Sequence, residues 1–233
     1  MRDALGLLTT FGRRGGVLSS RSLLWFPVIG AALGAIVGGA WWVADRAWSP
    51  LPAAVIVVII DLAVTGMLHV DGLADSADGL LPHATRERRL EIMRTPDVGA
   101  FGVTVVAVTL LVSVAALSSQ PVSVLLVVAL WCAARALVAV VPSTMPAARP
   151  GGMGAHLVDG ATRWTILALP AAIAVGAWGA GWAGAAGVTA GVLAGIAVLV
   201  LAARRIGGFT GDVLGATIVL TETVGLLVAA ARW

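Results

Sequence analysis

A short acidic stretch carries the residues of this 233-residue chain that are best suited to chemistry. Asp71, Asp75 and Asp78 stand at positions i, i+4 and i+7, so a helix places their three carboxylates in one narrow stripe. Like charges at this spacing repel one another, and a bound cation relieves the repulsion. Carboxylate oxygens suit Mg²⁺, Mn²⁺ or Ca²⁺ better than Zn²⁺. The stripe therefore predicts a metal site, and the plainer alternative is a solvated acidic helix end.

One glycine lies within this stripe, another directly follows it, and a histidine precedes it. Gly72 and Gly79 weaken a helix, so we expect another helix or a ligand phosphate to approach closely at these positions. His69 falls on the far side of the same helix from the aspartates. For His69 a structural role near the membrane interface is favoured over contact with a substrate.

An arginine-rich amphipathic stretch follows the acidic one. Arg86, Arg89 and Arg94 are candidates for a phosphate clamp that faces the aspartates, because the guanidinium group is a planar and permanently charged donor. The alternative is an interfacial helix held by lipid headgroups. Directly after it, Thr95 and Pro96 predict the start of the next helix, with Thr95 as the N-cap.

A glycine-rich turn precedes the last apolar run. Glycines let backbone N–H groups converge on an anion, and the N-terminus of the following helix carries partial positive charge. The residues expected to bind phosphate here are Gly207, Gly208, Thr210 and Gly211. Asp212 follows at once, and we expect it to join the metal site or to act as a base.

Composition tells which elements must position these groups. The chain is 59% apolar and 12% charged, with a mean hydropathy of +0.99, so it has too little polar surface for a water-soluble domain. We therefore predict an all-α fold, a polytopic integral membrane bundle that forms a single domain over residues 1–233. About seven apolar runs are long enough to cross a bilayer, with six as the fallback because the fifth and sixth are barely separated. The runs are 24–43, 51–70, 98–117, 122–141, 164–180, 181–203 and 213–231.

The distribution of arginine predicts the orientation. The positive-inside rule places the N-terminus in the cytoplasm, because 12 of the 15 arginines then lie on the cytoplasmic side. These are Arg2, Arg13, Arg14, Arg21, Arg86, Arg88, Arg89, Arg94, Arg149, Arg163, Arg204 and Arg205. The same topology puts the segments 71–97, 142–163 and 204–212 on one face, so we expect the active site at the cytoplasmic face. A net charge of +3 is too small to indicate a nucleic-acid binder.

Three charges fall inside the apolar runs. Asp61, Arg135 and Glu222 are costly in hydrocarbon, and we expect Arg135 to pair with one of the two acids inside the bundle. Together with the aspartate stripe they leave open a divalent cation transporter as an alternative function. The position of the stripe at the cytoplasmic end, rather than at the membrane midplane, disfavours that alternative.

Three separate strings carry a family resemblance. DGLADSADG after an apolar helix, RERRLEIMR running into DVGAFGV, and GGFTGDVLGA before the last run resemble, in the same order, the cobalamin synthase family of adenosylcobinamide-GDP ribazoletransferases. The resemblance extends over about 26–222. It implies a prokaryotic inner-membrane enzyme that joins adenosylcobinamide-GDP and α-ribazole, or α-ribazole 5′-phosphate, with release of GMP. Mg²⁺ is the cofactor that the family implies.

The resemblance also implies roles for individual residues. Asp71, Asp75 and Asp78 correspond to the binders of metal and diphosphate, Asp212 joins them, and Asp75, Asp78 and Asp212 are the expected catalytic groups. The string from Asp75 to Gly79 also resembles the start of the CDP-alcohol phosphotransferase signature, D-x-x-D-G, but its continuation departs from that signature. A phosphotransferase acting on lipid therefore remains an alternative. The expected partners are the two substrates, the bilayer, and either further copies of the chain or other enzymes of nucleotide-loop assembly.

Overall fold

The computed structural model describes residues 2–9, 20–149 and 165–232. Over these residues the chain is helical, which confirms the predicted class, and its β-structure is one isolated bridge between Ala147 and Phe209. The helices are α1 (Arg2–Leu8), α2 (Ser20–Leu23), α3 (Phe26–Ala47), α4 (Pro50–Thr65), α5 (Leu68–Leu80), α6 (Arg86–Ile92), α7 (Ala100–Ser118), α8 (Val124–Thr144), α9 (Ala168–Ile206) and α10 (Gly211–Ala229). Of the predicted segment 142–163, the part from residue 150 onward lies outside the described residues, as do Arg13, Arg14 and Arg163.

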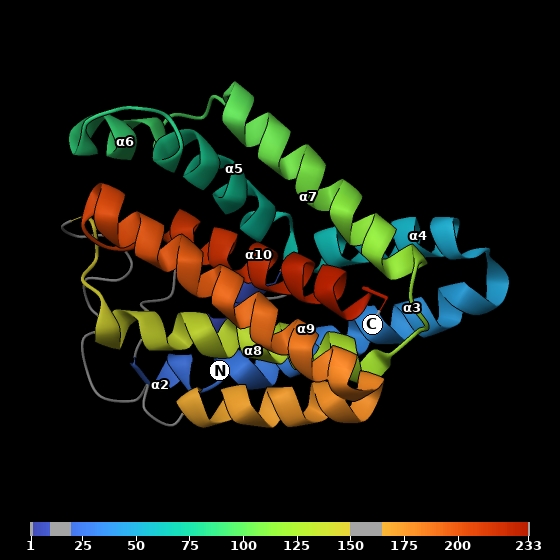
Figure 1. The fold of residues 1–233 in the computed structure, drawn as a ribbon. Coiled ribbons are helices and arrows are strands. Elements are labelled where there is room, and N and C mark those ends of the chain that lie inside the picture. The colour runs from blue at the N-terminus through green and yellow to red at the C-terminus, as the bar shows by residue number, and fades with distance from the viewer. Residues whose placement is uncertain (1, 10–19, 150–164, 233) are drawn as a thin grey trace.

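The described helices include five that are long and apolar enough to cross a membrane, and a sixth if the bent pair α4 and α5 counts as one span. One of the five covers 42 residues, Thr165–Ile206, which as a straight helix would be about 60 Å long, twice the thickness of the hydrocarbon core. Its backbone leaves the helical region at Ala180 and Gly181, and Figure 1 shows the two arms of α9 folding back on each other. The predicted break at this point is confirmed. With the two arms counted separately and the bent pair counted as one span, the described residues provide about seven spans.

The second apolar run is not the continuous helix that the sequence predicted over 51–70. Helix α4 ends before Gly66 and Met67, which both have positive φ, and α5 then runs at an angle of 90° to α4. Gly66 adopts the left-handed conformation without steric cost. Met67 (φ 59°) adopts it too, but its side chain makes the conformation costly. Because of this bend, the aspartate stripe lies on a separate helix, α5.

Small residues let the helices of the bundle approach one another closely. A Cβ added at Gly34 of α3 would lie 2.7 Å from the Cα of Val128 in α8, and one added at Gly187 of α9 would lie 2.7 Å from the carbonyl oxygen of Gly225 in α10. Such contacts take the place of a hydrophobic driving force between helices inside a bilayer. Figure 1 shows α5 and α7 on one side of α10, and α8, α9 and α3 on the other.

The charges inside the bundle are paired, as predicted. Arg135, whose side chain is fully buried, forms an ion pair with Glu222, and the indole N–H of Trp131 donates to Asp61 over 3.0 Å. Most arginines of the described residues instead lie near α6, the end of α9 and the start of α10, at one end of the bundle. The functional site must therefore be sought at that end.

Candidate active site

Helix α5 rests directly on the first turn of α10. A Cβ at Gly72 would lie 2.8 Å from the carbonyl oxygen of Asp212, and a Cβ at Gly215 would lie 3.1 Å from the carbonyl oxygen of His69. The expected close approach at Gly72 is confirmed, and the approaching element is the backbone of α10. At Gly79 the neighbour is the side chain of Met93, whose Cγ would stand 2.6 Å from an added Cβ.

This contact brings carboxylates from two helices together in what we call the acidic cluster, formed by Asp71, Asp75 and Asp212. Asp75 is partly buried on α5, and the charges of Asp212, Asp71 and Asp78 all act on it. Within the described ranges, no group of three or more His, Cys, Asp or Glu side chains is close enough to hold a metal ion by itself. Mg²⁺ is usually held by one or two carboxylates together with water and substrate phosphates, so the acidic cluster fits a metal shared with a diphosphate.

Asp78, the third aspartate of the stripe, is engaged differently. Its two carboxylate oxygens accept hydrogen bonds from the backbone N–H groups of Gly99, over 2.7 Å, and Gly102, over 2.9 Å. Asp78 thus caps the N-terminus of α7 from a neighbouring helix and ties α5 to α7. The helix start predicted at Thr95 and Pro96 is wrong, because α7 begins at Ala100 and the Thr95 hydroxyl donates to the carbonyl of Ile92 instead.

The glycine-rich turn is held by a second loop. Phe209 N–H donates to the carbonyl of Pro146 and the N–H of Ala148 donates to the carbonyl of Phe209, over 3.0 and 2.8 Å. A glycine is required at position 208, where the two loops meet, because an added Cβ would clash with the Ala148 nitrogen at 2.9 Å. Gly207 has φ 74° and ends α9 in the left-handed conformation. These two glycines therefore shape the turn, and their predicted contact with phosphate stays a prediction.

Thr210 and Asp212 begin α10. The Thr210 hydroxyl accepts from the N–H of Val213 as the N-cap and donates to Oδ2 of Asp212 over 3.1 Å. Gly211 lies between them at the first helical position. The Thr210 hydroxyl thus holds the Asp212 carboxylate at the start of α10, where its charge acts on Asp75 of α5, and its predicted role in the site stays a prediction.

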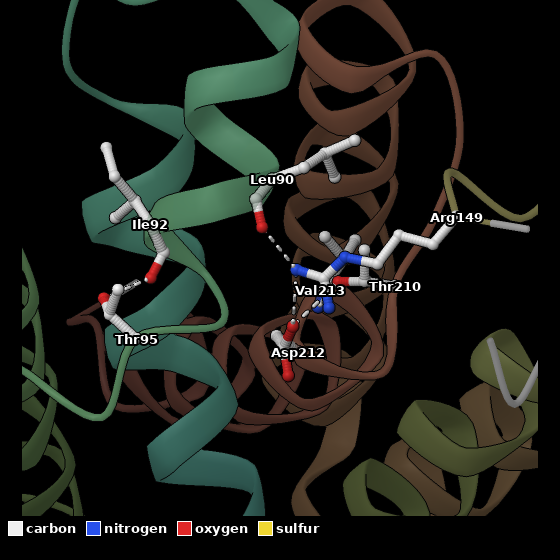
Figure 2. Close-up of polar contacts among 7 residues, drawn as sticks. All are labelled: Leu90, Ile92, Thr95, Arg149, Thr210, Asp212 and Val213. Carbon is white, nitrogen blue, oxygen red and sulfur yellow. Dashed lines mark hydrogen bonds and ion pairs between the residues drawn. The ribbon is translucent and has the colours of Figure 1, made fainter.

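Arg149 is the residue that sequence reasoning missed. Figure 2 shows its guanidinium between the Leu90 carbonyl, to which it donates over 3.0 Å, and Oδ2 of Asp212, which lies 4.0 Å away. Its Nε is buried without a hydrogen-bond partner in the described part of the chain. Burial lowers the pKa of the Arg149 guanidinium and the charge of Arg94 lowers it further, while Asp212 and Asp75 raise it. Arg149 is placed in the site by the backbone pairing of the loop at Ala148 with Phe209, and no local sequence pattern reveals that pairing.

The three arginines predicted as a phosphate clamp have separate positions. The guanidinium of Arg89 is buried and donates to the carbonyls of Gly79, Leu80 and Ala84, so it caps the C-terminus of α5. Burial lowers the pKa of Arg89, and so does the charge of Arg205.

The other two arginines of the predicted clamp are more exposed. Arg86 donates to the carbonyls of Ile206 and Ala148, over 2.9 Å each, and so connects α6 to both loops of the site. Arg94 is exposed, and its charge acts on Arg149. Of the predicted clamp, Arg94 is thus the arginine whose charge acts on Arg149 beside the acidic cluster.

A cluster of carboxylates with an arginine beside it, at one end of a frame of apolar helices long enough to cross a membrane, is typical of an integral membrane enzyme that acts on phosphate groups. The chain belongs to the cobalamin-5-phosphate synthase family, which it matches over residues 1–230. No solved structure matches the chain significantly.

Curated relatives carry the name adenosylcobinamide-GDP ribazoletransferase. The protein of Bradyrhizobium diazoefficiens is 40% identical over 88% of this chain and 81% of its own length. The protein of Shigella boydii is 38% identical over 89% of this chain and 87% of its own. The protein of Frankia casuarinae is 36% identical over 98% of this chain and 93% of its own. The family that the sequence motifs resembled is therefore confirmed.

Proposed function

We propose that this chain transfers the adenosylcobinamide phosphate of adenosylcobinamide-GDP to α-ribazole at the acidic cluster and releases GMP. The chain is a transferase of the last steps of cobalamin biosynthesis, as its family and its relatives indicate. The observation that carries the proposed location is the meeting of α5 and α10 at Gly72, which brings Asp71 and Asp75 together with Asp212.

The reaction is a displacement at phosphorus. A ribose hydroxyl of α-ribazole forms a new P–O bond with the phosphate attached to cobinamide, the bond between the two phosphates breaks, and GMP leaves with its bridging oxygen. The proton of the hydroxyl goes to a carboxylate. Asp75 is the best placed acceptor, because three carboxylates surround it and an added proton relieves their mutual repulsion.

The acidic cluster would hold Mg²⁺ jointly with the diphosphate. Asp71 and Asp212 are the proposed protein ligands, with Asp75 beside them, and Mg²⁺ would supply neutralisation of charge on the bridging and leaving oxygens. Arg149 and Arg94 hold the leaving nucleotide, since both present guanidinium groups next to the cluster. Asp78 positions α7 and is not a metal ligand in this proposal, because both of its oxygens already accept backbone hydrogen bonds.

We further infer that this end of the bundle faces the cytoplasm of a prokaryotic inner membrane. Arginine supports the inference, because Arg88, Arg94 and Arg204 are exposed there and Arg205 is partly exposed, whereas Arg46 is the exposed arginine at the outer end of α3. The substrates are highly anionic and cannot cross the bilayer unaided. A cysteine placed at Arg88 should therefore react with a membrane-impermeant maleimide only in inside-out vesicles.

The function is tested by GMP release from purified protein in lipid nanodiscs. We expect GMP to form from adenosylcobinamide-GDP only when α-ribazole or its 5′-phosphate and Mg²⁺ are both present. Arg149→Gln should lower kcat by about 100-fold, the scale of losing one charged contact in a transition state, whereas Arg88→Gln should leave it unchanged. Release of CMP from a cytidine diphosphate lipid, without GMP release, would contradict the proposal and favour a phosphotransferase acting on lipid.

A further inference from the structure

A small cavity lies inside the bundle, apart from the acidic cluster. Its walls come from α3, α4, α5, α7, α8 and α10, and its volume of about 40 Å³ leaves room for one or two water molecules. Most of the wall is aliphatic, but polar side chains enter it from several helices, among them Asp61 of α4, His69 of α5 and Thr109 of α7. The cavity is therefore too small for a substrate and has the polar lining that an internal water requires.

Three polar groups of the cavity wall lack a direct partner. His69 and Thr109 are each 6% exposed, and neither side chain forms a hydrogen bond within the described part of the protein. Asp61 accepts from the Trp131 indole with one carboxylate oxygen, and its other oxygen has no hydrogen bond within the same described ranges. Because an unpaired polar group is costly inside a membrane, these groups indicate a small hydrogen-bonding molecule in the space that they enclose.

Water matches the chemistry of these groups as well as the size of the cavity. The carboxylate of Asp61 only accepts, so its free oxygen needs a donor, whereas the His69 ring and the Thr109 hydroxyl each offer a donor and an acceptor. A buried water typically makes about three hydrogen bonds to polar groups that have no other partner. One water can therefore connect α4, α5 and α7 through their side chains.

We propose that the cavity holds a water bridge and that His69 is a positioning residue for the reaction, an inference that rests on the proposed function. The His69 backbone already meets α10, since a Cβ at Gly215 would lie 3.1 Å from the His69 carbonyl oxygen. The water bridge joins the side chain of the same residue to α4 and α7, so the start of α5 is held from two sides. His69 precedes Asp75 by six residues, about 9 Å along a helix axis, and a tilt at the start of α5 therefore displaces the acidic cluster.

The water bridge is tested by X-ray radiolysis of the protein in nanodiscs, followed by mass spectrometry. Radiation splits bound water into hydroxyl radicals, which oxidise the side chains that touch it even where bulk solvent does not reach. Trp131 lines the cavity and is 4% exposed, whereas Trp41 is 1% exposed and is not part of its wall. We expect Trp131 to be oxidised several times faster than Trp41, and Thr109→Val, which removes one partner of the water, to slow that oxidation. Equal rates at the two tryptophans would overturn the water bridge.

Steady-state kinetics test the positioning role. His69→Leu should lower kcat about tenfold, the scale of one lost hydrogen bond, and leave the KM for both substrates within about twofold of wild type, because the side chain touches neither substrate. His69→Gln keeps a donor and an acceptor and should recover most of kcat. The matched control is Thr189→Val, because Thr189 is exposed and its hydroxyl bonds only within its own helix, to Ala185. The control should match wild type in kcat and in both KM values.

The possible failures are distinguishable. A folded His69→Leu protein with the kcat of wild type would overturn the positioning role, and so would a loss of kcat that His69→Gln does not recover. If melting curves show that His69→Leu is unfolded, Thr109→Val should still lower kcat with unchanged KM values, whereas Thr109→Ser, which keeps the hydroxyl, should retain kcat; equal kcat in these two variants would overturn the role. Absence of GMP release by wild type would instead contradict the proposed function, and the oxidation of Trp131, which does not depend on turnover, would still decide the water bridge.

Discussion

The contact between α5 and α10 at Gly72 gives the sharpest test of how the acidic cluster is built. In Gly72→Ala the new Cβ would lie 2.8 Å from the carbonyl oxygen and 3.0 Å from the Cα of Asp212, about 0.6 Å short of the ordinary contact limit of 3.4 Å to that oxygen. The neighbour is backbone and cannot rotate away, so α10 must shift relative to α5. Overpacking of this kind costs about 1–3 kcal/mol, and the gain in helix propensity from Gly to Ala returns about 1 kcal/mol.

We therefore expect Gly72→Ala to fold with a small loss of stability and to lose most of its turnover, because a misplacement approaching 1 Å costs about 100-fold in rate. The assay is GMP release in nanodiscs, together with thermal unfolding of the same sample. The matched control is Gly39→Ala in α3, where an added Cβ meets nothing within 4 Å and activity should stay at the wild-type level. If Gly72→Ala turned over as fast as Gly39→Ala, the close contact at Asp212 would not position the catalytic groups, and this reasoning would be refuted.

Three further substitutions probe the frame of the site. Asp78→Asn replaces one acceptor of the α7 cap with a donor and should destabilise the protein by about 2 kcal/mol, seen as a lower Tm, whereas an unchanged Tm would argue against the cap. Arg89→Gln removes the donor that holds the last carbonyls of α5 and should lower the Tm strongly. The control Arg88→Gln breaks only an exposed ion pair and should change the free energy of unfolding by less than about 0.5 kcal/mol. Equal effects of the two substitutions would contradict the capping role of Arg89. Arg135→Met leaves Glu222 unpaired in the bundle and should cost about 3–5 kcal/mol in unfolding measurements, with partial recovery in a second variant that also carries Glu222→Leu.

The parts of the fold that follow from local pattern were predictable from the sequence. The lengths of the apolar runs gave the spans, and the spacing of Asp71 and Asp75 gave a helical stripe. Gly72 indicated a close approach because a glycine inside a helix needs a steric reason. The break within the long α9 segment followed from its length and its glycines.

Features that depend on distant partners were not predictable. Asp78 looks like its two neighbours in the stripe, yet its partners are backbone groups 21 and 24 residues further along the chain. Arg149 reaches Asp212 only because the loop before it pairs with Phe209. The 90° bend between α4 and α5 requires a positive φ at Met67, which no propensity suggests. In each case tertiary contact overrides the local pattern.

The most direct test of the central claim compares two aspartates in one assay. Asp75→Asn removes a carboxylate from the acidic cluster. Asp45→Asn makes the same change at an exposed position near the C-terminal end of α3. With adenosylcobinamide-GDP, α-ribazole and Mg²⁺ all saturating, we expect Asp75→Asn to release GMP at least about 100-fold more slowly than wild type, and Asp45→Asn to match wild type. Near-normal GMP release by a folded Asp75→Asn protein would contradict the claim that transfer takes place at the meeting of α5 and α10.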